Sequence, residues 1–165
     1  MDRLWAPWRL DYVSTAPRPD AAGGCFLCQA LAENKDRENL IAWRTPRSVV
    51  VLNRYPYNNG HLLVAPLAHK AELPNLAEPE LLDLQLIVCK MQTALAAILR
   101  PDGFNIGLNS GRVAGAGLPG HLHWHIVPRW NGDTNFMPVL AETKVISQSL
   151  DALFDSLVSE LNRFG

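Results

Sequence analysis

The sequence predicts an α+β fold, in which a long helix and a C-terminal helix accompany one mainly antiparallel sheet of about five strands. Three observations support this expectation. Short apolar runs separated by turn residues fill residues 40–66. Residues 79–100 carry apolar side chains at three- and four-residue intervals. Three histidines then alternate with apolar residues, which is the two-residue repeat of a strand.

The first half of the chain is expected to contain an arm, a short helix and a meander of strands. Residues 1–24 are rich in aromatic residues and proline without a clear period, so they are interpreted as an arm. A short helix is predicted from residue 25 to about residue 34. Turn signals such as Thr45-Pro46 separate three predicted strands. These strands are residues 40–43, 48–52 and 61–66.

The second half is expected to contain the long helix, a strand pair and a closing helix. The long helix ends at Pro101-Asp102-Gly103. Strands are predicted at residues 104–109 and 122–129, on either side of a glycine-rich loop. Residues 147–164 have helical spacing. The chain is therefore divided into the arm (1–24), one domain (25–138) and a helical extension (139–165).

Bulk properties exclude several classes of protein. The net charge of −1 and the pI of about 6.5 leave no overall basic field for nucleic acid. Charged residues, among them Asp83 and Lys90, interrupt the best candidate for a membrane span, so none is expected. Residues 1–5 lack the apolar segment of a secretion signal. A cytoplasmic protein is expected.

Chemistry is concentrated in the run from His121 to His125. On a strand, His121, His123 and His125 face one side, while the residues between them face the core. Imidazole serves as nucleophile, proton carrier or metal ligand. The alternative is a solvated strand face. The preceding loop carries Gly111, Gly115, Gly117 and Gly120, whose backbone amides could cradle an anion.

The cysteines suggest a second kind of site. Cys25 and Cys28 have the Cys-x-x-Cys spacing of redox or metal-binding pairs. A structural disulfide is disfavoured in a reducing cytosol. The alternative is a buried pair without metal. Cys89 lies in the long helix pattern and is expected in the core.

The alternating histidines followed by two apolar residues resemble the signature of the histidine triad (HIT) superfamily. Residues 51–54 and 60–66 are similar to the paired strands that precede the long helix in that family. Residues 5–9 and 128–136 are similar to its bacterial diadenosine tetraphosphate phosphorylase-like branch. The resemblance implies a HIT-like fold over about residues 25–138.

The resemblance also implies residue roles. His123 is expected to attack the α-phosphorus of a nucleotide and form a nucleotidyl-histidine, which water or phosphate then resolves. His125 would contact the phosphate, and His61 would orient His123. The remaining substrate-binding residues would be Asn53 at the ribose, Asn109 near the phosphates, and Gly115 and Gly117 through their backbone. For Asn53 the alternative is a turn residue at a strand end.

Further expectations concern metal and partners. Some bacterial members of the family bind zinc through a Cys-x-x-Cys, a histidine after a Pro-x-x turn and the first triad histidine. Those positions are Cys25, Cys28, His69 and His121, so a structural zinc ion is expected, and no organic cofactor. Most of the family forms homodimers through the long helix and an adjacent strand, so a homodimer is expected.

The resulting functional hypothesis is a hydrolase or transferase that acts on dinucleoside polyphosphates. Phosphorolysis is favoured over hydrolysis, because the glycines leave room for inorganic phosphate, and Arg112 or Arg129 could add hydrogen bonds. One alternative is a nucleoside phosphoramidase. It is weakened because several branches of the family place Ser or Gln where this chain has Gly117. Another is a non-catalytic regulatory module that binds nucleotides.

Overall fold

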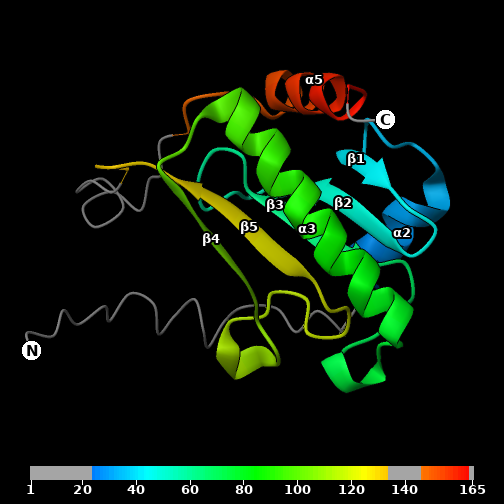
Figure 1. The fold of residues 1–165 in the computed structure, drawn as a ribbon. Coiled ribbons are helices and arrows are strands. Elements are labelled where there is room, and N and C mark those ends of the chain that lie inside the picture. The colour runs from blue at the N-terminus through cyan, green and yellow to red at the C-terminus, as the bar shows by residue number, and fades with distance from the viewer. Residues whose placement is uncertain (1–23, 134–145, 164–165) are drawn as a thin grey trace, which may run out of the picture.

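The computed structural model describes residues 24–133 and 146–163 (Figure 1). The arm, apart from Gly24, and the proposed boundary between residues 138 and 139 lie outside the described residues.

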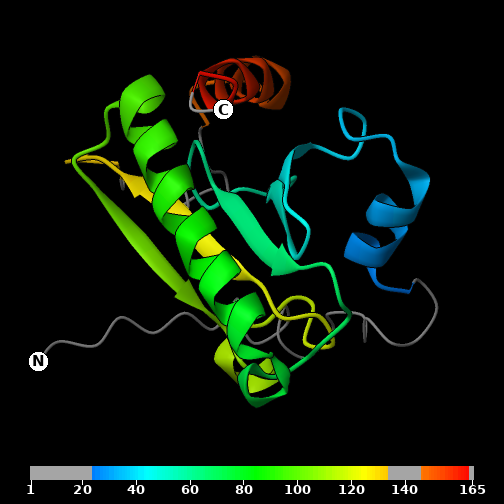
Figure 2. The same ribbon diagram turned by 45° about the vertical axis from the view of Figure 1, so that its right-hand side comes forward.

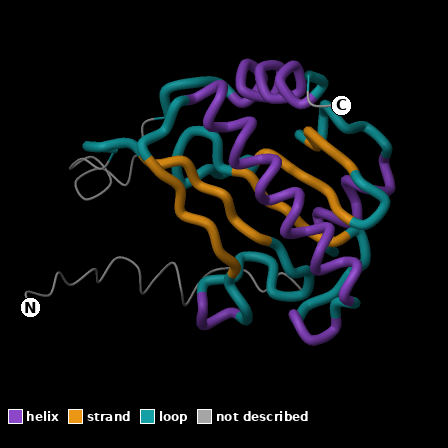
Figure 3. The backbone as a smooth tube through the Cα atoms, in the orientation of Figure 1, coloured by secondary structure: helices purple, strands orange, loops and turns teal. Residues whose placement is uncertain are grey.

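The described residues form one five-stranded sheet, as predicted. Its order is β1-β2-β3-β5-β4, and every pair of neighbouring strands is antiparallel. Figure 3 shows the strands of the sheet in orange. The strands are β1 (Ile41–Arg44), β2 (Ser48–Leu52), β3 (Leu62–Pro66), β4 (Gly103–Leu108) and β5 (Trp124–Arg129). The crossover from β3 to β4 carries the long helix, and the glycine-rich loop joins β4 to β5.

Three α-helices accompany the sheet in the described residues. They are α2 (Phe26–Glu33), α3 (Glu78–Leu99) and α5 (Leu150–Leu161), with short 3₁₀ turns η1 (Leu73–Asn75) and η2 (Arg112–Ala114). The long helix α3 crosses one face of the sheet (Figures 1 and 2). Helix α5 packs against α3 and β1.

The apolar period of α3 explains its place on the sheet. Its buried residues recur at three- and four-residue intervals and pack into the core with the side chains of the sheet: Leu84, Ile87, Val88, Met91, Ala94 and Leu95. By length and composition alone α3 could cross a membrane, which differs from the sequence expectation. Its contacts with β2, β3, β5 and α5 account for this apolar character within the fold.

The structure corrects two local predictions. Strand β5 begins at Trp124, so His121 and His123 precede its ladder, although Leu122 and Trp124 still pack in the core as expected. The expectation that Cys89 is a core residue is wrong, because its side chain is exposed on α3. Cys89 follows Val88, which is buried, and falls outside the apolar period.

Candidate functional site

A cavity of about 440 Å³ opens beside the histidines. Its walls come from α2, from strands β2 and β3, from the β2–β3 loop, and from the residues on either side of the start of β5. The lining residues are Phe26, Leu40, Val51, Leu52, Asn53, Arg54, Tyr55, Tyr57, Leu63, Gly117, Leu118, His123 and His125. A size of several hundred Å³ with apolar walls and a few polar groups is typical of small-molecule sites.

His123 is buried, and one of its ring nitrogens is already occupied. Its Nδ1 lies 2.9 Å from the backbone oxygen of His121. Since a carbonyl only accepts, Nδ1 carries the proton and Nε2 is unprotonated. Burial lowers the pKa of His123, although the bond to His121 opposes this shift. A neutral imidazole with a free Nε2 is a competent nucleophile.

A chain of hydrogen bonds links His125, which lines the cavity, to His61, which lies behind it and is not a lining residue. The backbone N–H of Tyr57 donates to His61 Nδ1 at 3.0 Å. The proton of neutral His61 is therefore on Nε2, which lies 2.9 Å from His125 Nδ1 and donates to it. His125 then carries its own proton on Nε2. That buried nitrogen has no hydrogen-bond partner among the described residues.

The two hydrogen-bonded histidines, His61 and His125, are uncharged near neutral pH. Burial, followed by the charges of His125 and His123, lowers the pKa of His61 to about 3. Burial, followed by the charge of His123, lowers the pKa of His125 to about 4. The unpartnered Nε2–H of His125 is thus a neutral donor at the cavity, suited to an anionic oxygen.

The β2–β3 loop holds His61 in place. The side-chain oxygen of Asn53 accepts from the backbone N–H of Tyr55 at 2.9 Å, and its Nδ2 lies 3.2 Å from His61 Nδ1. Asn53 therefore lines the cavity and also orders the turn. Gly60 has φ +80°, and a Cβ there would lie 2.5 Å from Leu99 Cδ1, so the loop requires glycine before His61.

The glycine-rich loop is ordered mostly by its own backbone. Gly111 and Gly115 adopt the positive φ angles expected of an anion-binding loop. Asn109 Nδ2 donates to the Gly115 oxygen at 3.3 Å, so these two residues shape the loop. Of the candidate loop residues, Gly117 lines the cavity, whereas Asn109 and Gly115 do not.

The two arginines considered for phosphate binding lie elsewhere. Arg129 donates to the Asp133 carboxylate at 2.6 Å and to Asn105 Oδ1 at 2.7 Å. Arg112 is exposed in η2. Neither arginine lines the cavity.

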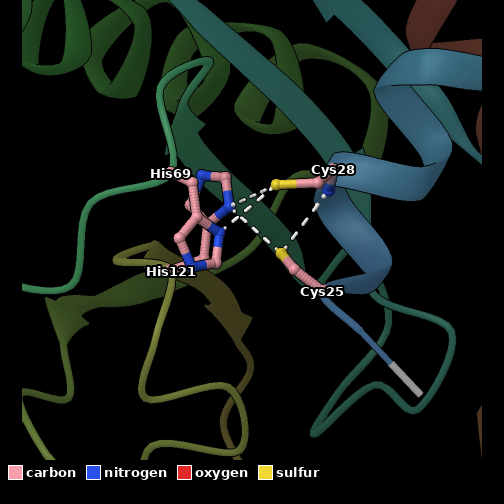
Figure 4. A group of neighbouring side chains, drawn as sticks. All are labelled: Cys25, Cys28, His69 and His121. Atoms are coloured by element: carbon pink, nitrogen blue, oxygen red, sulfur yellow. Dashed lines mark hydrogen bonds between the residues drawn. The ribbon is translucent and has the colours of Figure 1, made fainter. Parts of the chain in front are cut away.

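The four candidate metal ligands meet in one cluster (Figure 4). The ligand atoms of Cys25, Cys28, His69 and His121 all lie within 4.8 Å of one another. Cys25 Sγ is 3.2 Å from His121 Nδ1, and Cys28 Sγ is 3.3 Å from His69 Nδ1. The cluster joins the start of α2 to the loop after β3 and to the residues before β5.

The protonation chemistry of the cluster fits a metal ion. His121 Nε2 donates to the Pro66 oxygen at 2.8 Å, which leaves Nδ1 unprotonated toward the cysteines. Without a metal, burial first and then Cys25 raise the pKa of the Cys28 thiol. A cation favours the thiolate instead. Two sulfur and two nitrogen donors suit a tetrahedral, closed site.

Sequence reasoning missed several cavity residues. Phe26 lies between the two cysteines in the sequence, and Tyr57 lies in the segment between the predicted strands at residues 48–52 and 61–66. Leu40 has φ +58°, which is uncommon for a bulky residue and is often found where ligands bind. Aromatic residues in a turn next to a histidine could have indicated Tyr57; nothing in the sequence indicates Leu40.

Comparisons with known proteins show which family the chain resembles. A family model for the HIT domain matches residues 34–132. An AP-4-A phosphorylase of Mycobacterium tuberculosis (strain H37Rv) is 40% identical over 154 residues, which is 91% of this chain and 79% of that protein. The asymmetrical bis(5'-nucleosyl)-tetraphosphatase of Schizosaccharomyces pombe is 36% identical over 56% of this chain and 50% of its own length.

Solved structures show the same fold. A Zn-bound histidine triad family protein from Mycobacterium smegmatis superposes with a TM-score of 0.69 at 22% identity, covering 86% of this chain and 95% of that one. A histidine triad nucleotide-binding protein from Sulfolobus tokodaii superposes with a TM-score of 0.70 at 24% identity, covering 85% and 93%.

Proposed function

The chain belongs to the HIT domain family, and we propose that it transfers a nucleotidyl group from a dinucleoside polyphosphate through a covalent bond to His123. One observation carries the proposal: the cavity holds an unprotonated Nε2 on His123 and an unpartnered Nε2–H on His125. A nucleophile beside a neutral donor suits attack on a phosphorus whose oxygens gain charge. The two relatives named above, one a phosphorylase and one a tetraphosphatase, support the substrate class.

The proposed reaction has two displacement steps. His123 Nε2 attacks the α-phosphorus, a P–N bond forms, and the bond to the bridging oxygen breaks, so the polyphosphate nucleotide departs with that electron pair. The Nε2–H of His125 donates to a phosphoryl oxygen, and the Gly117 backbone contributes on the loop side. The acceptor then displaces His123 and restores its neutral ring.

We favour inorganic phosphate over water as the acceptor. The phosphorylase relative supports this, and so does Gly117, where an added Cβ would meet no atom within 4 Å. Incubation with diadenosine tetraphosphate and labelled phosphate tests it. Label in ADP, with ATP as the second product, is expected. Unlabelled AMP and ATP, at a rate indifferent to phosphate, would identify a hydrolase.

Two alternatives make different predictions. A regulatory module that binds nucleotides without turnover would yield no covalent intermediate, whereas the proposed enzyme yields a labelled nucleotidyl-protein after rapid acid quench. A nucleoside phosphoramidase would prefer substrates with an amine leaving group. The free Nε2 of His123 argues against simple binding, because binding has no need for a nucleophile.

We further propose that Cys25, Cys28, His69 and His121 hold a structural zinc ion. Zinc there would supply a cross-link between α2 and the sheet rather than a reacting group. Because Phe26 lies between the two cysteines and lines the cavity, this cross-link would also fix one cavity wall. A cytoplasmic location, where thiols stay reduced, is consistent with this role.

A homodimer is proposed through α3 and the edge strand β4. Leu82 and Leu86 of α3 are each 60% exposed, and Ile106 of β4 is 40% exposed. An edge strand also offers unpaired backbone groups to a second copy. Light scattering should give the mass of a dimer for the parent and of a monomer for Leu86→Glu. A parental mass that equals one chain would contradict the proposal.

A further inference from the structure

Two exposed tyrosines border the cavity on the β2–β3 loop. Tyr55 is 82% exposed and Tyr57 is 56% exposed, yet both line the cavity that holds His123 and His125. Their backbones are fixed, because the N–H of Tyr55 donates to Asn53 and that of Tyr57 donates to His61. Aromatic rings held rigidly at a cavity rim but left open to solvent are suited to stacking on a planar ligand.

The ring of Tyr57 has one covered face and one open face. It stacks on the His125 ring at 5.8 Å between centroids with planes 20° apart, and it is tilted against His61 at 4.6 Å. The 56% exposure of Tyr57 therefore belongs mainly to the face turned away from these histidines. The ring is a preformed platform next to the donor that we assign to the phosphate.

Tyr57 lines the same cavity as the apolar residues but differs from them in its contacts. Phe26, Leu40 and Val51 supply apolar surface suited to the nucleoside whose phosphorus is attacked. The Tyr57 ring instead contacts His61 and His125, and His125 is the residue proposed to donate to the reacting phosphate. A dinucleoside polyphosphate carries its second base on the leaving chain, which begins at that phosphate.

We propose that Tyr57, extended by Tyr55, is the stacking subsite for the nucleobase of the leaving nucleotide. This inference rests on the proposed function and adds to it a reason for preferring dinucleoside over mononucleoside polyphosphates. Stacking of a base on an aromatic side chain contributes about 1–3 kcal/mol, so the second base should tighten binding about 5- to 150-fold.

The test compares two nucleotides that differ only in the second nucleoside: diadenosine tetraphosphate and adenosine 5'-tetraphosphate. Calorimetric Kd values are measured in a His123→Asn background, so that turnover does not compete with binding. Tyr57→Ala should remove most of the advantage of the dinucleoside and leave the affinity for the mononucleoside within about twofold. Tyr57→Phe should retain the advantage, because stacking needs the ring and not the hydroxyl.

The possible outcomes distinguish failure of the proposed subsite from failure of the proposed function. Equal affinity of the two nucleotides before Tyr57 is changed, or equal losses in Tyr57→Ala, would overturn the subsite while leaving the proposed function intact. No binding of either nucleotide would overturn both. If Tyr57→Ala fails to fold by circular dichroism, Tyr57→Leu, which keeps apolar bulk without a planar ring, takes its place with the same expectation.

Discussion

The proposed metal ligands are drawn from more of the chain than the histidines proposed for catalysis. The cluster joins residues as distant in sequence as Cys25 and His121, from α2, the loop after β3 and the residues before β5. His61 and His125 lie at neighbouring strands, since β3 pairs with β5 and Leu63 is opposite His125. The pairing of β3 with β5 therefore places two of the histidines proposed for catalysis, His61 and His125, whereas the cysteine–histidine cluster joins a helix to that sheet.

In both groups, a hydrogen bond with the backbone fixes the orientation and tautomer of a histidine ring. A backbone group occupies one ring nitrogen and leaves the other for function: the Pro66 oxygen on His121, the His121 oxygen on His123, and the Tyr57 N–H on His61. His121 belongs to both groups, because its ring faces the cysteines while its carbonyl holds His123. Loss of a cluster ligand should therefore reduce stability, and loss of a catalytic histidine should reduce rate.

The largest expected effect is that of His123→Ala on rate. Removal of the nucleophile should lower turnover of diadenosine tetraphosphate by at least ~10³-fold. The zinc content and the unfolding temperature should stay close to the parental values, because His123 is not one of the four proposed ligands and its side chain bonds to the backbone oxygen of His121. Near-parental turnover would remove His123 from this role.

Substitution of a ligand in the cysteine–histidine cluster should instead lower zinc content and stability. Protein purified without chelator is expected to contain one zinc ion per chain, and Cys28→Ser should lose it. A loss of about 3 kcal/mol in unfolding free energy would lower Tm by ~10 °C. Cys89→Ser is the matched control, since Cys89 is exposed on α3 away from the cluster. Metal-free parental protein with the same Tm would contradict the site.

The hydrogen-bonded histidines also predict an acid-sensitive stability. In the folded protein, burial lowers the pKa values of His61 and His125 to about 3 and 4, below the ordinary histidine pKa of about 6.5. The unfolded chain therefore binds protons that the folded chain does not, so this stability is complete above about pH 6.5 and falls as the pH is lowered. At pH 5 the loss is about 2 kcal/mol for each histidine.

The measurement is the unfolding free energy at pH 7 and pH 5, at one zinc concentration, for the parent and for His125→Asn. Asparagine does not titrate, so the variant should lose about 2 kcal/mol less between the two pH values. Any effect of acid on the zinc ligands is common to both proteins. Parallel pH profiles would show that His125 has no such depressed pKa.

The sequence predicts the fold well because its elements depend on local patterns. The apolar run at residues 48–52 and the apolar period of α3 predict the observed bounds to within a residue. Cys89 shows that an apolar residue within a helical pattern need not be buried, because its neighbour Val88 takes the inward position. The histidine alternation was informative even though His121 and His123 precede the ladder of β5.

Less of the candidate site than of the fold can be predicted from the sequence. A Cys-x-x-Cys and a histidine row are visible as patterns, and the structure brings their members together. The tautomers, however, depend on the oxygens of Pro66 and His121 and on the N–H of Tyr57. Backbone groups have no signature in a sequence, because every residue has them; only the folded chain selects which ones reach a histidine.

The smallest expected effect on stability belongs to Gly117→Ser, in the part of the glycine-rich loop that lines the cavity. An added Cβ at Gly117 would meet no atom within 4 Å, and its φ lies outside the left-handed region, so unfolding free energy should change by less than ~0.5 kcal/mol. The new hydroxyl can donate to a leaving group that needs a proton, such as an amine. One such hydrogen bond contributes about 0.5–1.5 kcal/mol, so the rate with a nucleoside phosphoramidate should rise about 2- to 10-fold relative to diadenosine tetraphosphate.

Gly117→Ala adds the bulk without the hydroxyl and should leave that ratio unchanged. An equal rise in both variants would assign the effect to the shape of the loop, and no rise in Gly117→Ser would show that Gly117 does not set the choice of leaving group.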